Sequence, residues 1–238
     1  MIKFLPILLI VLYAVGMWLF SAWRLKHELD SKSTPLDEPR MKDMLARLGA
    51  AMDLPPVRAF VYEIAPVNGL AAPDGRVFLT RGFLDQLARD RVTEAELASV
   101  IAHELGHVAH GHARRRMLDF AGQNVIRTVL AGVLGRFLPG IGHWLGALVA
   151  SAVAARLSRQ DEYEADAFAA ALMVKAGLGT GPQKSLLQRL GKLTGSGGRG
   201  PVAWLASHPA TDRRIAAIEM LEERWQQRHS GDSDRAPN

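Results

Sequence analysis

A His-Glu-x-x-His array at residues 103–107 is the part of this sequence best suited to chemistry. His103 and His107 are spaced i and i+4, so in a helix they point to the same side. Two imidazoles placed in this way can bind one Zn²⁺ ion. Glu104 lies about a quarter-turn from His103, where a general base for water at the metal is expected. The array predicts a hydrolytic zinc site, although the same string can also occur by chance on any helix.

The residues around the array predict the helix that it needs. Thr93 and Glu96 form a capping box at the start, and Gly111 is a stop signal. Apolar residues at helical spacing form a face opposite the two histidines: Leu97, Ala98, Ile101, Leu105 and Val108.

A third metal ligand is expected, because catalytic zinc usually takes three protein ligands and leaves one position for water. The chain has no cysteine, so the third ligand must be a histidine or a carboxylate. Glu162 and Asp166 are spaced i and i+4 in a predicted helix from Ser158 to Ala176, which the Ser158-x-x-Asp161 pattern would cap. One carboxylate can bind the metal and the other can accept the second ring N–H of a ligating histidine. Ordinary acidic residues at a solvated helix start would give the same spacing.

Four segments, in order, resemble the motifs of the HtpX/BepA family of zinc endopeptidases, which also contains the CAAX prenyl endopeptidases. They are Asn68-Gly69-Leu70-Ala71-x-Pro73-Asp74-Gly75-x-Val77-x-Leu79, the array at 103–107, Ser158-Arg159-x-x-Glu162-Tyr163-x-Ala165-Asp166, and Ser207-His208-Pro209 followed by Arg214. Together they cover most of residues 40–225. This chain departs from the family pattern at Gly69, usually Ala, at Asp74, usually Gly, and at Gly111, which interrupts a stretch that is usually helical. These departures concern the substrate groove and the helix length.

The resemblance implies a role for each residue of the site. His103, His107 and Glu162 would bind one Zn²⁺ per chain, Glu104 would be the base, and Asp166 would accept a hydrogen bond from a ligand. His208 and Arg214 would lie near the reacting carbonyl, where His208 could donate to the oxyanion and Arg214 could orient a carboxylate or the substrate backbone. The segment near Asn68 would present an edge strand to an extended peptide. His110 and His112 are expected to be plain helix-end residues.

The N-terminus is expected to anchor the chain in a membrane. Phe4 to Trp23 is a run of twenty residues without a charge, and as a helix it would span about 30 Å. A cleaved signal peptide is the alternative, but no small-x-small cleavage site follows the run. Arg24, Lys26 and Lys32 outnumber the positive charges before the run, so a single-pass protein of the cell (inner) membrane with a cytoplasmic catalytic domain is favoured. The periplasmic side stays open.

The predicted fold is mainly α with a small β-sheet (α+β), a zincin-type metallopeptidase domain behind an N-terminal transmembrane helix. Strands are expected at 58–64 and 76–80. The expected division is an anchor at 1–26, a linker at 27–39, a metallopeptidase domain at 40–228 and a disordered tail at 229–238. Region 117–157 is apolar but contains Arg127, Arg136 and a Pro-Gly break, so buried or membrane-touching helices are favoured over a transmembrane hairpin.

The sequence therefore predicts a membrane-anchored zinc metalloendopeptidase, and the resemblance implies that it hydrolyses unfolded or misassembled proteins in quality control. The alternative is a silent pseudoprotease that binds misfolded proteins like a chaperone. Expected partners are protein or peptide substrates and membrane lipid. The net charge of +5 comes with no nucleic-acid-binding motif, so nucleic acid is not expected as a partner. The sequence indicates no oligomeric state.

Overall fold

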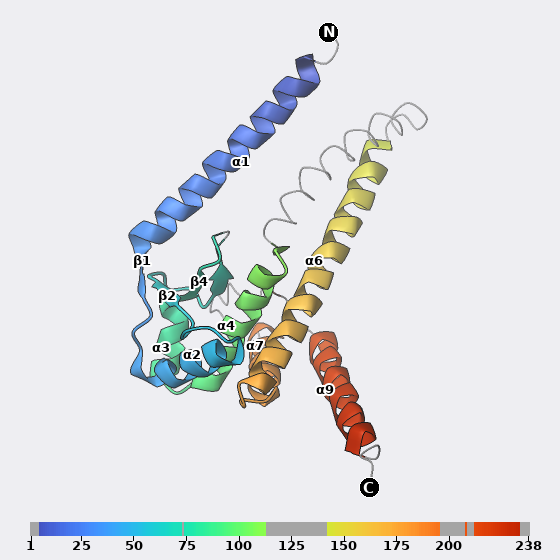
Figure 1. The fold of residues 1–238 in the computed structure, drawn as a ribbon. Coiled ribbons are helices and arrows are strands. Elements are labelled where there is room, and N and C mark those ends of the chain that lie inside the picture. Colours follow the sequence, from blue (N-terminus) through green and yellow to red (C-terminus); the bar gives the residue numbers. More distant parts are fainter. Residues whose placement is uncertain (1–4, 73, 113–141, 196–207, 209–211, 234–238) are drawn as a thin grey trace.

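The computed structural model describes residues 5–72, 74–112, 142–195, 208 and 212–233, which are mainly helical with one four-stranded sheet (Figure 1). The helices are α1 (Leu5–Lys32), α2 (Pro39–Ala51), α3 (Arg81–Ala88), α4 (Glu94–Ala109), α6 (Gly142–Lys175), α7 (Gly181–Gly195) and α9 (Asp212–Ser233). The strands are β1 (Ser33–Pro35), β2 (Ala59–Tyr62), β3 (Gly69–Ala71) and β4 (Val77–Thr80). The predicted combination of many helices with a small sheet is confirmed.

The sheet has the order β1-β2-β4-β3. Strand β2 runs parallel to β4, whereas β1 and β3 are antiparallel to their neighbours β2 and β4. Strands β2 and β4 fall inside the two predicted strands. Strand β3 lies at one edge of the sheet, as the resemblance implied for the segment near Asn68. In the described part of the chain, no strand pairs with its outer edge.

The two faces of the sheet belong to different apolar clusters, because side chains alternate along a strand. Val61, Val77 and Leu79 point into the main core, which α2, α3, α4, α6 and α7 complete. Phe78 points to the other face, where it packs with Leu29 of α1. Each face of the sheet therefore carries buried side chains, and the face of the main core lies beside α4.

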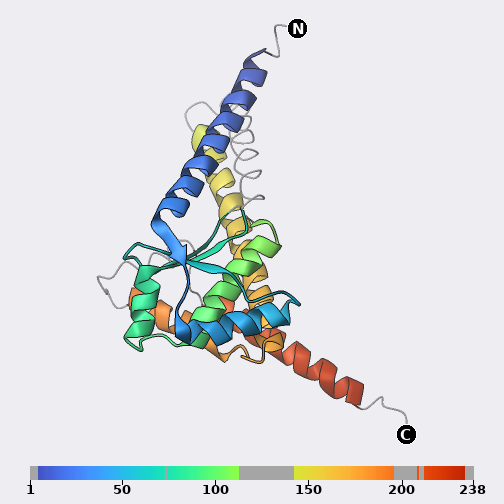
Figure 2. The ribbon, with the colours of Figure 1, turned by 60° about the vertical axis from the view of Figure 1, so that its left-hand side comes forward.

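Helix α4 lies between the sheet and α6, and it carries the His-Glu-x-x-His array (Figure 2). Its capping box is confirmed, since Thr93 Oγ1 accepts from the Glu96 N–H and Glu96 Oε2 accepts from the Thr93 N–H. The predicted apolar face is buried at Leu97 and Ile101. The histidine face is buried as well, because α6 packs against it. The site residues are thus inside the protein rather than on a solvated surface.

Helix α6 corrects one prediction. It runs without interruption from Gly142 to Lys175, so no helix starts at Ser158 and the Ser158-x-x-Asp161 pattern is not a cap. The apolar sequence before Ser158 contains many good helix formers, and it continues the helix instead of ending it. Residues 117–141 of the ambiguous region lie outside the described residues. Residues 142–157 form the first half of α6, which extends from the body on the same side as α1 in both views (Figures 1 and 2).

The N-terminal boundaries also differ from the prediction. Residues 27–32 continue α1 and residues 33–35 form β1, so the segment expected to be a linker holds regular structure. Two i,i+4 ion pairs, Lys26 with Asp30 and Glu28 with Lys32, favour this last part of the helix. At the other end, residues 229–233 of the expected disordered tail belong to α9, and residues 234–238 lie outside the described residues. Within the described ranges, no helix is both long enough and apolar enough to cross a membrane.

Candidate metal centre

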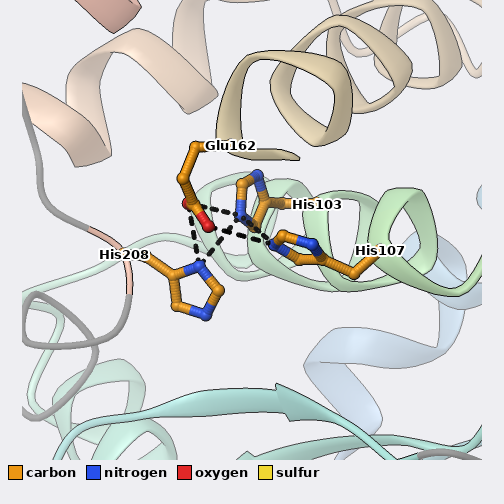
Figure 3. Close-up of side chains that lie close together, drawn as sticks. All are labelled: His103, His107, Glu162 and His208. Atoms are coloured by element: carbon orange, nitrogen blue, oxygen red, sulfur yellow. Dashed lines mark hydrogen bonds and ion pairs between the residues drawn. The ribbon is translucent and has the colours of Figure 1, made fainter. Parts of the chain in front are cut away.

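Side chains from two helices and one loop residue meet beside the sheet. Helix α4 supplies His103 and His107, α6 supplies Glu162, and His208 approaches from the region before α9 (Figure 3). Each of the four is buried, with an exposed fraction of 7% or less. The structure brings together the three side chains predicted as ligands, and it adds His208 to them.

The spacing of the three predicted ligands fits one zinc ion. His103 Nε2 lies 3.1 Å from His107 Nε2. Glu162 oxygens lie 3.4 Å from His103 Nε2 and 3.5 Å from His107 Nε2. Ligands at about 2.0–2.1 Å from a tetrahedral zinc ion would be separated by about 3.3–3.4 Å from one another. The donor set of two imidazoles and one carboxylate is also a common one for catalytic zinc.

The charge of the cluster favours a divalent cation as well. Glu104, Glu162 and Asp166 are three buried carboxylates, and Arg214 is the buried side chain with a permanent positive charge among the described residues of the cluster. Buried charges are costly unless they are paired or bind a metal. One Zn²⁺ ion together with Arg214 would balance three carboxylates.

Asp166 fixes the ring of His103. Its Oδ1 lies 3.0 Å from His103 Nδ1, which leaves Nε2 of that ring for the metal. Arg214 holds the carboxylate in turn, with Nε donating to Oδ2 at 2.6 Å and Nη2 donating to Oδ1 at 2.7 Å. Asp166 lies one helical turn after Glu162, the predicted ligand, and its role as a hydrogen-bond acceptor for a ligating histidine stays a prediction.

The same contacts set the protonation of the pair. Burial favours a neutral His103, but its hydrogen bonds with Asp166 and Glu162 prevail and raise the pKa of His103 to about 9. Burial would raise the pKa of Asp166, but the charge of Arg214 and its hydrogen bonds lower it to about 2. Asp166 is therefore ionised at neutral pH. Because a proton and a metal ion compete for His103, metal affinity should increase as the pH rises.

Glu104, the predicted general base, is buried beside the ligand cluster. Its side chain is 1% exposed, and Oε1 has no hydrogen-bond partner. His208 Nε2 lies 3.5 Å from this oxygen. An unpaired carboxylate oxygen in a buried site is costly, and a water molecule that it deprotonates would satisfy it. The orphaned oxygen thus fits a hydrolytic site.

The structure shows where the side chains of Arg214 and His208 lie. Arg214 was expected to orient a carboxylate or the substrate backbone, and the carboxylate that it orients is Asp166, because its guanidinium is 3% exposed and bound bidentately there. His208 was expected to donate to the oxyanion. Its Nδ1 lies 2.9 Å from Glu162 Oε2, so one nitrogen of the ring is turned to the ligand cluster and the other to Glu104.

The sequence-based prediction missed His112. It treated His112 as a plain helix-end residue, but the side chain is 1% exposed and its Nδ1 lies 2.7 Å from His107 Nδ1. The available signal was Gly111, whose positive φ of 63° turns the chain back towards α4. Exposed His110, the C-cap of α4, agrees with the prediction.

The close crossing of α4 and α6 depends on Gly106. A Cβ at this position would lie 2.9 Å from both the Cα and the carbonyl oxygen of Ala165. Backbone atoms cannot give way as a side chain can, so we expect Gly106→Ala to cost about 1–3 kcal/mol of stability through overpacking. The higher helix propensity of Ala returns at most about 1 kcal/mol. Zinc affinity should fall too, because α6 carries Glu162.

Thermal unfolding and zinc titration of the two proteins measure this effect. Gly181→Ala is the matched control, since a Cβ there has open space around it. A Gly106→Ala protein as stable as wild type, with unchanged zinc affinity, would contradict the proposed tight crossing.

Comparison with known proteins decides the family. The family model described as Peptidase family M48 matches residues 35–222. The chain belongs to peptidase family M48. Membership in M48 confirms the resemblance to HtpX-type enzymes and makes this chain a metallopeptidase, whose divalent metal is typically zinc.

Individual relatives agree with the M48 assignment. The chain is 30% identical to the metalloprotease LoiP of Escherichia coli K12 over 199 residues, 80% of this chain and 75% of LoiP. It is 29% identical to a protease HtpX homologue of Prosthecochloris aestuarii over 224 residues, 77% of this chain and 72% of that protein. It is also 29% identical to the metalloprotease YcaL of Escherichia coli K12 over 187 residues, with coverages of 79% and 70%.

Proposed function

We propose that this M48 peptidase is a membrane-anchored endopeptidase that cuts extended segments of unfolded or misassembled proteins. One observation carries the proposal: the edge strand β3 lies directly against the base. A Cβ built on Gly69 of β3 would lie 3.5 Å from Glu104 Oε1. A peptide that adds to the outer edge of β3 would therefore pass beside Glu104 and the metal ligands.

Strand addition selects for unfolded substrates on physical grounds. The backbone N–H and C=O groups of an edge strand pair with any chain that is extended and has its own backbone groups unpaired. Folded proteins have already paired these groups internally. This recognition depends on backbone hydrogen bonds rather than on particular side chains, which suits an enzyme of protein quality control.

The proposed chemistry assigns one task to each residue. His103, His107 and Glu162 would hold one zinc ion, which supplies Lewis-acid activation of the water and of the peptide carbonyl. Glu104 Oε1 would accept the proton of the attacking water and return it to the leaving amine. His208 Nε2, which is turned towards Glu104, would donate to the developing oxyanion. Asp166 would keep the proton of His103 on Nδ1.

The purified full-length protein in detergent provides the test, with reduced and carboxymethylated α-lactalbumin as the unfolded substrate and native α-lactalbumin as its matched control. We expect internal cleavage of the unfolded form, its loss with a chelator, and its recovery with added zinc. Equal cleavage of both forms would reject the strand-addition proposal. Release of single terminal residues would reject the endopeptidase assignment.

Zinc stoichiometry is a separate prediction. Elemental analysis should give one zinc per wild-type chain, and replacement of His103, His107 or Glu162 with Ala should lower zinc occupancy strongly. His110→Ala is the control, since this exposed residue is not a proposed ligand. Full occupancy in the Glu162→Ala protein would move the third ligand elsewhere, with His208 as the next candidate because it lies in the same cluster.

The proposed anchor is the uncharged run from Phe4 to Trp23. Large apolar side chains are strongly exposed along α1, at Leu12, Tyr13, Leu19, Phe20 and Trp23. A series of exposed apolar residues of this length would be unfavourable in water and favourable in lipid. The first half of α6 extends on the same side of the body as α1, which would bring it near the same bilayer (Figures 1 and 2).

Alkaline carbonate extraction tests the anchor. The full-length protein should stay in the membrane pellet, and a variant without residues 1–23 should be released. The deletion ends before Glu28 because this residue and Leu29 contact the sheet. A truncated protein that remains in the pellet would show that another segment, such as 117–157, is integral to the membrane.

A further inference from the structure

His112 is the most deeply buried residue of the site that has no role so far. It lies just after the end of α4, and Gly111 with its positive φ returns the chain so that the His112 ring packs against His107. The two ring centroids are 4.9 Å apart. His107 makes this contact through Nδ1, whereas its Nε2 faces Glu162.

The hydrogen bonds of His112 connect His107 of α4 to Glu164 of α6. His112 Nδ1 lies 2.7 Å from His107 Nδ1. On the opposite side of the ring, His112 Nε2 lies 3.1 Å from Glu164 Oε2. Gln160 Nε2 donates to the other oxygen of Glu164 at 3.0 Å. Glu164 is on α6, two residues after the proposed ligand Glu162, so these hydrogen bonds lead from one ligand-bearing helix to the other.

We propose that His112 and Glu164 form a positioning relay that orients His107 for the metal. The inference rests on the proposed role of His107 as a ligand through Nε2. A neutral imidazole that binds metal at one nitrogen carries its proton on the other, so His107 Nδ1–H donates to His112 Nδ1. His112 must then carry its own proton on Nε2, and it donates that proton to Glu164.

The proton positions decide between this relay and a second metal site. His110, His112 and Glu164 are close enough to hold a metal ion among themselves. To do so, His112 would need an unprotonated Nε2, which would put its proton on Nδ1. Two N–H groups would then face each other across 2.7 Å, between His107 and His112. A zinc ion held by His107 would therefore prevent neutral His112 from binding a second metal ion together with His110 and Glu164.

The relay gives His107 the kind of support that His103 has. His103 Nδ1 is held by Asp166, which Arg214 fixes, and His107 Nδ1 is held by His112, which Glu164 fixes. Loss of such an outer partner typically lowers metal affinity or activity by about 10–100-fold. We expect a loss in this range when the acceptor at His112 is removed.

Zinc affinity of the full-length protein, measured by competition with a chromogenic chelator, tests the relay. His112→Phe keeps a buried ring but removes the acceptor, and it should weaken zinc binding by about 10–100-fold. His112→Asn places an amide oxygen near the former Nδ1 and should restore most of the affinity. His110→Ala, the exposed neighbour, should bind zinc like wild type. Unchanged affinity in His112→Phe would overturn the relay.

A direct measurement covers the case in which His112→Phe fails to fold. In the zinc-loaded wild-type protein, nitrogen-15 NMR of the histidine side chains should show His112 protonated on Nε2 and unprotonated on Nδ1. The opposite tautomer would overturn the proposal. So would a second bound zinc that disappears in His110→Ala, because that result would establish the competing site. Failure of the proposed function looks different: wild type and His107→Ala would then bind zinc equally weakly.

Discussion

The Glu104→Gln protein should bind zinc like wild type and lose peptide hydrolysis by more than the ~10²–10⁴-fold that a general base typically contributes. Gln keeps the size and helix propensity of Glu, so α4 and its buried packing should be preserved. It removes the oxygen that can accept the proton of the attacking water. The same group would have to protonate the leaving amine, and this second step adds to the loss.

Cleavage of unfolded α-lactalbumin and zinc content, measured on the same preparation, separate the two effects. His110→Ala is an accompanying control, because it alters an exposed residue near the site without touching the base. Near wild-type cleavage by Glu104→Gln would exclude this mechanism. Absence of cleavage in the wild type, together with tight binding of unfolded protein, would instead support a pseudoprotease.

Arg214→Met should destabilise the protein by about 3–5 kcal/mol, the usual effect of removing one partner of a buried ion pair. The guanidinium is buried, binds Asp166 with two hydrogen bonds and lies 3.5 Å from a Glu162 oxygen. Met can fill the space of the side chain, but it leaves two carboxylates without their cation. The pKa of Asp166, which the charge of Arg214 lowers, should rise in this variant.

Chemical denaturation of the metal-free protein measures the loss. The double variant Arg214→Met/Asp166→Asn is the matched control, because it also removes the charge that the single variant leaves unpaired. The double variant should recover part of the lost stability. The double-mutant cycle should give a coupling energy between Arg214 and Asp166 well above the deviation from additivity found for independent sites. Additive effects of the two substitutions would mean that the buried pair does not act as a unit.

The grouping of the proposed ligands could be predicted because their spacing is local. A helix fixes where i and i+4 side chains point, so His103 with His107 and Glu162 with Asp166 could be assigned to common faces from the sequence alone. The resemblance to known motifs implied that the two faces meet, because it placed His103, His107 and Glu162 on one metal ion. The close helix crossing at Gly106 that brings them together was not predicted.

The missed features depend on contacts that no local sequence pattern specifies. Arg214 and Asp166 are 48 residues apart, and no local pattern relates them. His112 lies beyond the last regular turn of α4, and only a folded-back chain brings it to His107. Strand β1 is three residues long, too short for an alternating pattern to identify, and β3, of the same length, was expected only from the resemblance. The helix start predicted at Ser158 is wrong because a local capping pattern is weaker than a long run of helix formers that continues through it.

The direct passage from α1 into β1 has a consequence for where this enzyme can work. The helix ends at Lys32, whose carbonyl oxygen accepts a hydrogen bond from the Glu63 N–H at 2.9 Å, so the sheet begins with no flexible tether. With the run up to Trp23 inside a bilayer, residues 24–32 span about 13 Å as a helix. The catalytic body would then stand at a fixed height above the lipid. The active site would then stay at this distance from the membrane, and only unfolded segments that enter this region would be cut.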